Sequence, residues 1–267
     1  MRVQRSILIL ALALLLSLMA CAPLRPAQKP ASTEYPSVTP TSTSEGAYWH
    51  LVFHDEFNAA SLSSIWSTEL PWGPTDPHEL EYYVPDALGF NDGLLRVTAQ
   101  KQSFQRKDYT SGMISTYPQF SLTYGYVEIR AKLPSGRGLW PAFWLLASDQ
   151  KSSNEIDVFE LLGSDPNTIY MTFHHDAPPG HLSVQGTYHG PDFTQGFHTF
   201  AVDWEPNEIV WYVDGVARYR VSQNIPQFPM NIIANLAVGG SWPGAPNIFT
   251  AFPAYFDIDY IRVYQHN

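Results

Sequence analysis

Cysteine is nearly absent from the sequence, since Cys21 is the only one among 267 residues. A disulfide within the chain is therefore excluded. Charge is also scarce, because Asp, Glu, Lys and Arg make up 15% of the residues and the formal net charge is −10. No basic cluster interrupts this acidic balance, which disfavours nucleic acid and anionic polymers as partners and fits a neutral one.

The sequence also lacks any sustained 3.6-residue periodicity, so long helices are not expected. Short segments of alternating or continuous apolar character recur instead, and the dipeptide Asp214-Gly215 is a strong hairpin signal. Together they predict an all-β fold, a jelly-roll sandwich of two antiparallel sheets with no internal repeat. The predicted strands are 51–57, 93–99, 125–133, 139–147, 155–162, 168–175, 200–204, 209–213, 216–219, 232–238 and 256–264.

Two of these strands carry specific expectations about their environment. Residues 125–133 alternate, which predicts that Glu128, Arg130 and Lys132 lie on a face open to water. Residues 139–147 are apolar on both faces, which predicts a central strand. The aromatic content of 14% suits a β protein with an aromatic-lined groove.

The N-terminus has the pattern of an export signal, predicted to span residues 1–20. Arg2 and Arg5 precede an apolar run, Ile7 to Met19, that is short for a membrane span. Leu18 to Cys21 resembles the lipobox of bacterial lipoproteins, in which the cysteine is lipidated after cleavage. The alternative is an ordinary signal peptide cut near Ala22, with Cys21 lost.

Residues 21–46, rich in Pro, Ser and Thr, are predicted to form a disordered tether, because they contain too few large apolar residues for a core. The catalytic domain is expected to span residues 47–267 as a monomer that meets the membrane only through its lipid anchor. The expected location is the cell surface of a bacterium, or the medium if the protein is freely secreted.

Three acids stand inside an apolar run at residues 154–162. Burying bare carboxylates in a strand is costly, so a function is expected for them. Glu155 and Asp157 share a face by alternation, and a one-residue bulge near Val158–Phe159 would bring Glu160 to the same face. Paired carboxyls that flank one sugar bond are the groups that a retaining glycosidase uses.

Two other interpretations of the acids remain open from the residues alone. The acids would be solvated if the strand were an exposed edge, although its apolar residues favour burial. They would also form a metal cluster if His174 and His175 joined them, although no standard ligand spacing accompanies these residues.

Aromatic residues in the chain are candidates for a glycan groove, because sugar rings pack their C–H faces on aromatic rings. Trp140 and Trp144 share a face of one strand, and Trp242 follows Gly239-Gly240. The alternative is that these tryptophans are core residues. His174, on the strand after the acids, is a candidate for a hydrogen bond to a carboxylate or a sugar hydroxyl, or is structural. Trp72, Tyr82 and Tyr83 lie near turns rich in Gly and Pro.

The residues 155–160 have the form E-x-D-x-x-E, and with other motifs they resemble glycoside hydrolase family 16, the laminarinase and lichenase group. The resemblance runs from about Phe53 to Tyr264, and the ordered set of motifs makes it specific. The other motifs are Asp55–Phe57, Gly125–Glu128, Gly138–Trp144, Phe197–His198, Trp211–Gly215, Asn235–Gly240 and Asp259–Tyr264.

This resemblance implies a jelly roll with a cleft across its concave sheet and retaining hydrolysis within a neutral β-glycan chain. It implies that Glu155 is the nucleophile, Glu160 the acid/base, and Asp157 the carboxylate between them. No cofactor is implied for catalysis. A structural Ca²⁺ is implied on the convex side, with Glu56, the backbone carbonyl of Gly93 and Asp259 as its ligands.

The sequence departs from laminarinases in ways that bear on linkage preference. Residues 152–154 replace Trp-Pro-Gly, Met113 stands where arginine is common, and His78-Glu79 replaces an Asn-Glu pair, which leaves Glu79 and Tyr82 as substrate-binding candidates. The predicted activity is endo-hydrolysis of β-1,3 or mixed β-1,3-1,4 glucan. The alternatives are a hydrolase or transglycosylase of an agarose-like galactan or xyloglucan, and a glycan-binding module without turnover.

Overall fold

The structure is a computed structural model that describes residues 49–149, 151–152, 154–177 and 180–266. The predicted signal peptide, Cys21 and the tether lie outside the described residues. Within the described part of the chain, no helix is long and apolar enough to cross a lipid bilayer.

The described chain forms strands joined by turns, with one 3₁₀ turn, η1 (Pro85–Ala87). The strands are β1 (Trp49–Asp55), β2 (Glu81–Tyr83), β3 (Leu88–Asn91), β4 (Leu94–Ala99), β5 (Tyr109–Ser111), β6 (Met113–Ser115), β7 (Gly125–Lys132), β8 (Leu139–Ala147), β9 (Glu155–Glu160), β10 (Thr168–Ala177), β11 (Gly180–His189), β12 (His198–Glu205), β13 (Glu208–Val213), β14 (Val216–Val221), β15 (Met230–Val238) and β16 (Ala254–His266).

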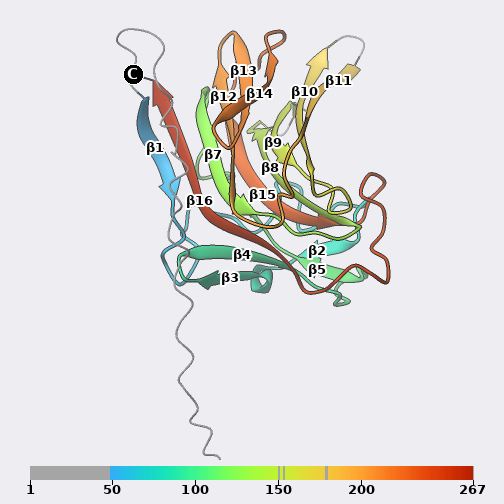
Figure 1. Cartoon of the computed structure of the whole chain (residues 1–267). Coiled ribbons are helices and arrows are strands. Elements are labelled where there is room, and N and C mark those ends of the chain that lie inside the picture. Colours follow the sequence, from blue (N-terminus) through green and yellow to red (C-terminus); the bar gives the residue numbers. More distant parts are fainter. Residues whose placement is uncertain (1–48, 150, 153, 178–179, 267) are drawn as a thin grey trace, which may run out of the picture.

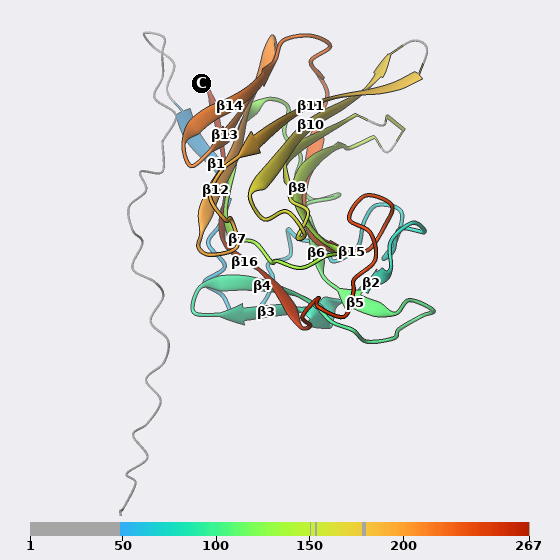
Figure 2. The ribbon, with the colours of Figure 1, turned by 45° about the vertical axis from the view of Figure 1, so that its right-hand side comes forward.

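Two antiparallel sheets stack on each other, which confirms the predicted sandwich (Figure 1). In the described residues, one sheet has the order β14-β13-β12-β7-β16-β4-β3, with β1 also pairing with β16. The other has the order β11-β10-β9-β8-β15-β6, and it carries the three acids on β9. Figure 2 shows that its β8, β10 and β11 curve over the end of the molecule where β2 and β5, a short parallel pair, lie.

The core fills the space between the two sheets with large apolar side chains. Phe159 of β9 packs on Phe200 of β12 with a ring-centroid distance of 4.4 Å, and both rings are fully buried. Trp204 and Trp211, from the first sheet, are also fully buried. Aromatic side chains bury a large area each, so contacts of this kind hold β9 firmly against the opposite sheet.

The predicted hairpin at Asp214-Gly215 is confirmed. Both residues have positive φ, 50° and 72°, and they join β13 to β14. Two successive residues in this region are what a two-residue turn between twisted strands requires. Strand β8 is central in its sheet, between β9 and β15, as its apolar pattern predicted.

The prediction that Glu128 lies on a solvent-exposed face of β7 is wrong. This side chain is buried under Tyr260 and Tyr126. Their hydroxyls donate hydrogen bonds of 2.8 and 3.2 Å to its two carboxylate oxygens. Burial raises its pKa, and the two hydroxyl donors act in the opposite direction. Alternation therefore identified the two faces correctly, but aromatic hydroxyls cover part of the outer one.

Candidate active site

The three acids lie on β9 and reach one surface because the strand contains a bulge. Glu160 pairs with Ala142 of β8, whereas Asp157 pairs with Trp144, so the register shifts between them. The pairing with β10 shifts at the same place. Val158 and Phe159 both point into the core, which confirms the predicted bulge.

Glu160 lies at the wall of the cleft, where its side chain is shielded from solvent. Its side chain is buried, Trp140 Nε1 donates a 3.0 Å hydrogen bond to Oε1, and the Thr172 hydroxyl lies 3.5 Å from Oε2. Loss of solvation raises the pKa of Glu160 to about 8, and the charge of Glu155 adds to this, while the two donors oppose it. Glu160 is therefore a protonated acid at neutral pH.

Glu155 and Asp157 form a hydrogen-bonded carboxyl pair beside Glu160. Burial raises the pKa of both groups well above the usual range, and each is raised further by a neighbouring acid. His174 lowers the pKa of Glu155, and its Nε2 lies 3.9 Å from Glu155 Oε1 and 3.2 Å from Asp157 Oδ2. The two carboxyl groups therefore titrate as a coupled pair, and ionising both of them at once is disfavoured.

Exposure distinguishes the two members of this pair. The Glu155 side chain is 29% exposed and Asp157 only 3%. Water reaches Glu155 from the cleft, so the ionised form is less costly there than at Asp157. Glu155 is accordingly the member of the pair that a ligand in the cleft can reach.

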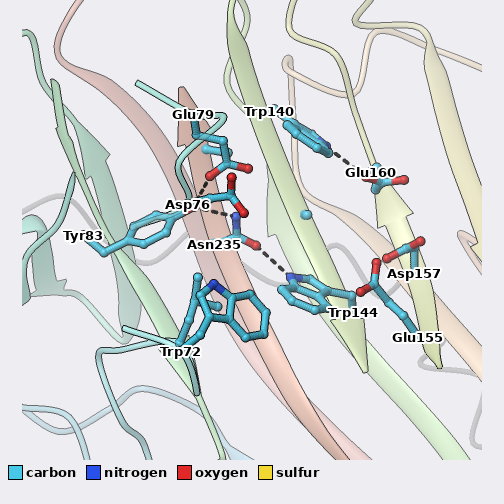
Figure 3. Close-up of a pocket in the computed structure, with 13 residues that line it drawn as sticks. Trp72, Asp76, Glu79, Tyr83, Trp140, Trp144, Glu155, Asp157, Glu160 and Asn235 are labelled. Atoms are coloured by element: carbon cyan, nitrogen blue, oxygen red, sulfur yellow. Dashed lines mark hydrogen bonds between the residues drawn. The ribbon is translucent and has the colours of Figure 1, made fainter. Parts of the chain in front are cut away.

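A cleft pocket of about 220 Å³ lies over the acids (Figure 3). Its opposite wall is a chain of hydrogen bonds from strands that are distant in sequence. Trp144 Nε1 donates to Asn235 Oδ1 at 2.8 Å, and Asn235 Nδ2 donates to the Tyr83 hydroxyl at 3.0 Å. That hydroxyl donates to Glu79 Oε2 at 3.4 Å. These contacts fix the plane of the Trp144 ring in the cleft.

Behind this wall lies a second pair of carboxyl groups, Glu79 and Glu81. Glu81 is fully buried and accepts a 2.7 Å hydrogen bond from the Val238 N–H. Burial raises the pKa of both acids, and each acts on the other through a hydrogen bond. The hydrogen bond from Val238 to Glu81 anchors β2 to the end of β15.

The structure brings most of the predicted groove residues to the cleft. Trp140, Trp144 and Glu79 line the pocket. Trp242 lies at its edge, 39% exposed, with its ring 5.4 Å from that of Trp140 and at 89° to it. Trp72 lies 6.4 Å from Trp144 at the other edge.

Tyr82 does not line this pocket. It is the middle residue of β2, and its ring packs on Phe104 at 5.0 Å, on the side away from Tyr83. Three polar residues that line the pocket were not among the predicted substrate-binding residues. They are Asp76, Tyr83 and Asn235. Alternation along β2 could have shown that Glu81 and Tyr83 share a face. Asn235 comes from a distant strand, and only the fold places it there.

The metal alternative that combined His174 with His175 is wrong. Consecutive residues of a strand point to opposite faces, and His175 is buried against Phe173 with a ring distance of 5.2 Å. Glu155, Asp157 and His174 do converge, since their nearest oxygen and nitrogen atoms all lie within 4.8 Å of one another. The metal alternative therefore fails for His175 and remains a prediction for Glu155, Asp157 and His174.

The predicted calcium ligands lie elsewhere, and their side chains do not fit the ion as they stand. Arg262 donates two hydrogen bonds, of 2.8 and 2.9 Å, to the two oxygens of Glu56. Arg130 pairs with Asp259. Arginine already neutralises both carboxylates, so the predicted set offers a calcium ion chiefly the Gly93 carbonyl.

Comparisons with known proteins agree on one family. The family model described as "Glycosyl hydrolases family 16" matches residues 83–262. The endo-1,3-1,4-beta-glycanase EglC of Rhizobium meliloti is 37% identical over 239 residues, which cover 80% of this chain and 51% of that protein. A beta-glucanase of Rhodothermus marinus is 34% identical over 245 residues, covering 82% of this chain and 86% of that protein.

Solved structures are similar over the same region. The catalytic domain of an endo-1,3-beta-glucanase (laminarinase) from Thermotoga petrophila has a TM-score of 0.76 and 36% identity, covering 82% of this chain and 98% of that one. The chain spans about half the length of the Rhizobium meliloti relative. The matched region includes the whole of β9 with its three acids.

Proposed function

The chain belongs to glycosyl hydrolases family 16, and we propose that it cleaves internal bonds of β-1,3-glucan or mixed β-1,3-1,4-glucan. The observation that carries this proposal is the acid row on the bulge of β9, where Glu160 holds a proton with a pKa of about 8. One acid that is protonated and one that is ionised, on the same wall of a cleft, are the two states that glycosidic cleavage uses. The relatives named above support a glucan as the substrate.

In the first step, the Glu155 carboxylate attacks the anomeric carbon of the sugar in the cleft. The bond to the glycosidic oxygen breaks, and Glu160 transfers its proton to that oxygen, so the downstream chain leaves as an alcohol. The proton that Glu155 shares with Asp157 moves toward Asp157 as Glu155 forms its ester bond. Asp157 therefore stabilises the nucleophile without changing the total charge of the site.

In the second step, water replaces the departed chain. Glu160, now ionised, takes a proton from this water while the water oxygen attacks the anomeric carbon. The ester bond to Glu155 breaks, and Glu155 leaves as a carboxylate. Two inversions give a product with the configuration of the substrate. No step needs a cofactor, because carboxyl groups and water supply every proton and every bond.

The aromatic walls favour a flat neutral sugar as the ligand. Trp140 and Trp144 line the pocket and Trp72 and Trp242 stand at its edges, so rings are available on both sides of the acids. The pocket walls carry the acids Asp76 and Glu79 and none of the described Lys or Arg side chains. An anionic glycan would be repelled there.

Product analysis on several glycans tests the proposal. We expect cleavage of laminarin or lichenan to oligosaccharides of mixed length, and none of agarose or xyloglucan. Release of galactan or xyloglucan fragments in place of glucan fragments would redirect the proposal to those substrates. Longer products on addition of acceptor sugars would identify a transglycosylase, and binding without turnover would identify a glycan-binding module.

A structural calcium ion is a separate proposal that catalysis does not need. Because arginines neutralise Glu56 and Asp259, such an ion would depend on backbone carbonyl oxygens such as that of Gly93. Melting curves with and without a chelator decide the matter. A melting temperature that falls by several degrees in the chelator would establish calcium binding. Unchanged melting curves would refute the proposed calcium site.

We further propose that the domain is a surface lipoprotein anchored through Cys21. The supports are the position of the only cysteine after an apolar run and the Pro/Ser/Thr-rich segment that follows it. Such an anchor suits an enzyme whose polymeric substrate is too large to import. Expression of wild type and Cys21→Ser in a bacterium, followed by separation of membrane from medium, tests the anchor. Equal amounts of both variants in the medium would refute it.

A further inference from the structure

Three side chains, His174, His181 and Asp176, form a row from the catalytic acids to the outer end of the β10–β11 hairpin. His174 Nε2 faces Asp157 and Glu155 at 3.2 and 3.9 Å, and His174 Nδ1 lies 3.2 Å from His181 Nε2. His181 Nδ1 lies 3.7 Å from Asp176 Oδ1. His181 is 47% exposed and Asp176 49%, so the row ends in solvent. None of the catalytic steps described above uses His181.

The strand register explains why these groups meet. His174 and Asp176 are two residues apart on β10, so they share a face. His181 of β11 stands directly opposite Asp176, which places it diagonally across from His174 on the same face. Diagonal neighbours of this kind are within reach of long side chains. The two imidazole rings lie nearly parallel, at 13°, with 5.3 Å between their centroids.

Proton counting shows what the row requires. The acid pair needs a hydrogen on His174 Nε2, because a bare ring nitrogen facing a negatively charged carboxyl pair would be repelled. Asp176 sets no such requirement on His181 Nδ1, because the 3.7 Å contact is longer than a hydrogen bond and both side chains are half exposed to water. One more hydrogen must lie between His174 Nδ1 and His181 Nε2, whichever ring donates it.

We propose that His181 is a positioning residue that keeps the hydrogen of His174 on Nε2, the ring nitrogen that lies nearest to the Glu155–Asp157 pair. Held this way, His174 stabilises the single negative charge of the pair. If His174 turned a bare nitrogen to the pair instead, the pair would take up a second proton and donate it to that nitrogen. Glu155 would then no longer be a nucleophile. The kinetic consequence rests on the proposed glycosidase function, whereas the hydrogen position does not.

Charged groups from three segments surround the two rings. Glu155 and Asp157 face them from β9, and Asp176 faces them from β10. Asp149, after β8, lies close enough to Asp176 for the two charges to interact. The charged groups that face the two rings are therefore carboxyl groups, and Lys151 lies close enough to Asp149 to offset part of its charge.

Nitrogen NMR of the histidine-labelled wild-type domain tests the hydrogen position without any substrate. We expect His174 Nε2 to carry a hydrogen at neutral pH, and His181→Ala to populate the form with a bare Nε2. The signals are assigned from the spectra of His174→Ala and His181→Ala. A bare Nε2 in the wild type, or an unchanged His174 signal in His181→Ala, would overturn the proposal.

Kinetics on a soluble glucan test the consequence. His181→Ala should lower kcat by about 3- to 10-fold, the rate equivalent of one hydrogen bond, with KM unchanged and the acid limb of the pH profile shifted upward. His181→Gln should recover most of the rate, because its amide can donate to His174 Nδ1. A higher KM with unchanged kcat would show that His181 binds glucan directly, which contradicts the proposal.

A double mutant and a matched control complete the test. In a His174→Ala background, His181→Ala should have no further effect, since it acts through His174. An equal loss in both backgrounds would contradict this. His189→Ala is the control, because His189 lies on the same strand but contacts Thr168 and should leave kcat unchanged. If wild type cleaves no glycan, the proposed function fails, while the NMR result still decides the hydrogen position.

Discussion

The indole nitrogen of Trp140 donates a 3.0 Å hydrogen bond to Oε1 of Glu160. One side chain thus forms part of the cleft wall and contacts the acid that we propose protonates the leaving oxygen. A donor to a carboxyl oxygen stabilises the ionised form, so Trp140 lowers the pKa of Glu160 against the larger effect of burial. In the proposed mechanism, this contact would couple substrate binding to proton transfer.

The pH profile of the wild type should reflect Glu160 directly. Since burial raises its pKa to about 8, kcat/KM should fall as the pH rises through that value and Glu160 loses the proton it must donate. On the acid side, kcat/KM should fall as the Glu155–Asp157 pair gains a second proton, and the raised pKa of Glu155 places this limb above pH 4.5. Initial rates on laminarin between pH 4 and 10 measure both limbs. Full activity at pH 10 would contradict the assignment of Glu160 as the acid.

Replacing Trp140 should shift the alkaline limb of the pH profile of kcat/KM. Trp140→Phe keeps an aromatic ring but removes the donor to Glu160, so the ionised form of Glu160 becomes less stable and its pKa rises. We expect the limb to shift upward by about one pH unit, from the free energy of a hydrogen bond to a charged group. Trp144→Phe is the control, because Trp144 donates to Asn235 instead. A limb that moves equally in both variants, or downward in Trp140→Phe, would refute the coupling.

The raised pKa of Glu160 also predicts a pH-dependent effect on stability. Wild-type Glu160 is protonated in both the folded and unfolded states below pH 4, so Glu160→Gln should change little there. Between pH 4.5 and 8 the unfolded state loses this proton and the folded state keeps it, so the free energy of unfolding falls as the pH rises.

Glutamine does not ionise, so its folded state is not penalised by having to keep a proton that the unfolded state has lost. Glu160→Gln should therefore be more stable than wild type at pH 8 by on the order of a few kcal/mol. Urea denaturation at pH 4 and pH 8 measures the difference. Equal stabilisation at both values would show that proton linkage is not the cause.

The two glutamates should respond differently to an added nucleophile. Glu155→Ala should abolish turnover, and azide should restore it with an inverted product, because azide takes the place of the carboxylate. Glu160→Ala should still react with substrates whose leaving group needs no proton, and azide should then give a retained product. Asp157→Asn should lose less activity than either. Identical azide products from the two alanine variants would refute the assigned roles.

Much of the fold and the core of the site could be predicted from local sequence patterns. Three acids in an apolar run implied burial, and the spacing of Glu155, Asp157 and Glu160 required a bulge, which the register of β9 contains. The Asp214-Gly215 hairpin followed from turn chemistry. These features depend on residues close together in sequence, for which alternation and turn preferences are sufficient.

The features that sequence reasoning missed depend on contacts between distant segments. Asn235 joins Trp144 to Tyr83 only because β15 lies beside β8 and β2 crosses their end. Strand β11 was missed although Leu182, Val184 and Tyr188 alternate with polar residues, because it is an exposed edge strand whose few apolar residues give only a weak signal. Glu128 is buried because a tyrosine two residues away on β7 and another on β16 cover it.

The configuration of the first sugar product tests the central claim most directly. Proton NMR during the first minutes of laminarin or lichenan hydrolysis separates the two anomers before they interconvert. The account predicts that the β anomer accumulates first, because Glu155 forms a covalent intermediate that water then opens from the same face. Initial accumulation of the α anomer would contradict the roles assigned to Glu155 and Glu160.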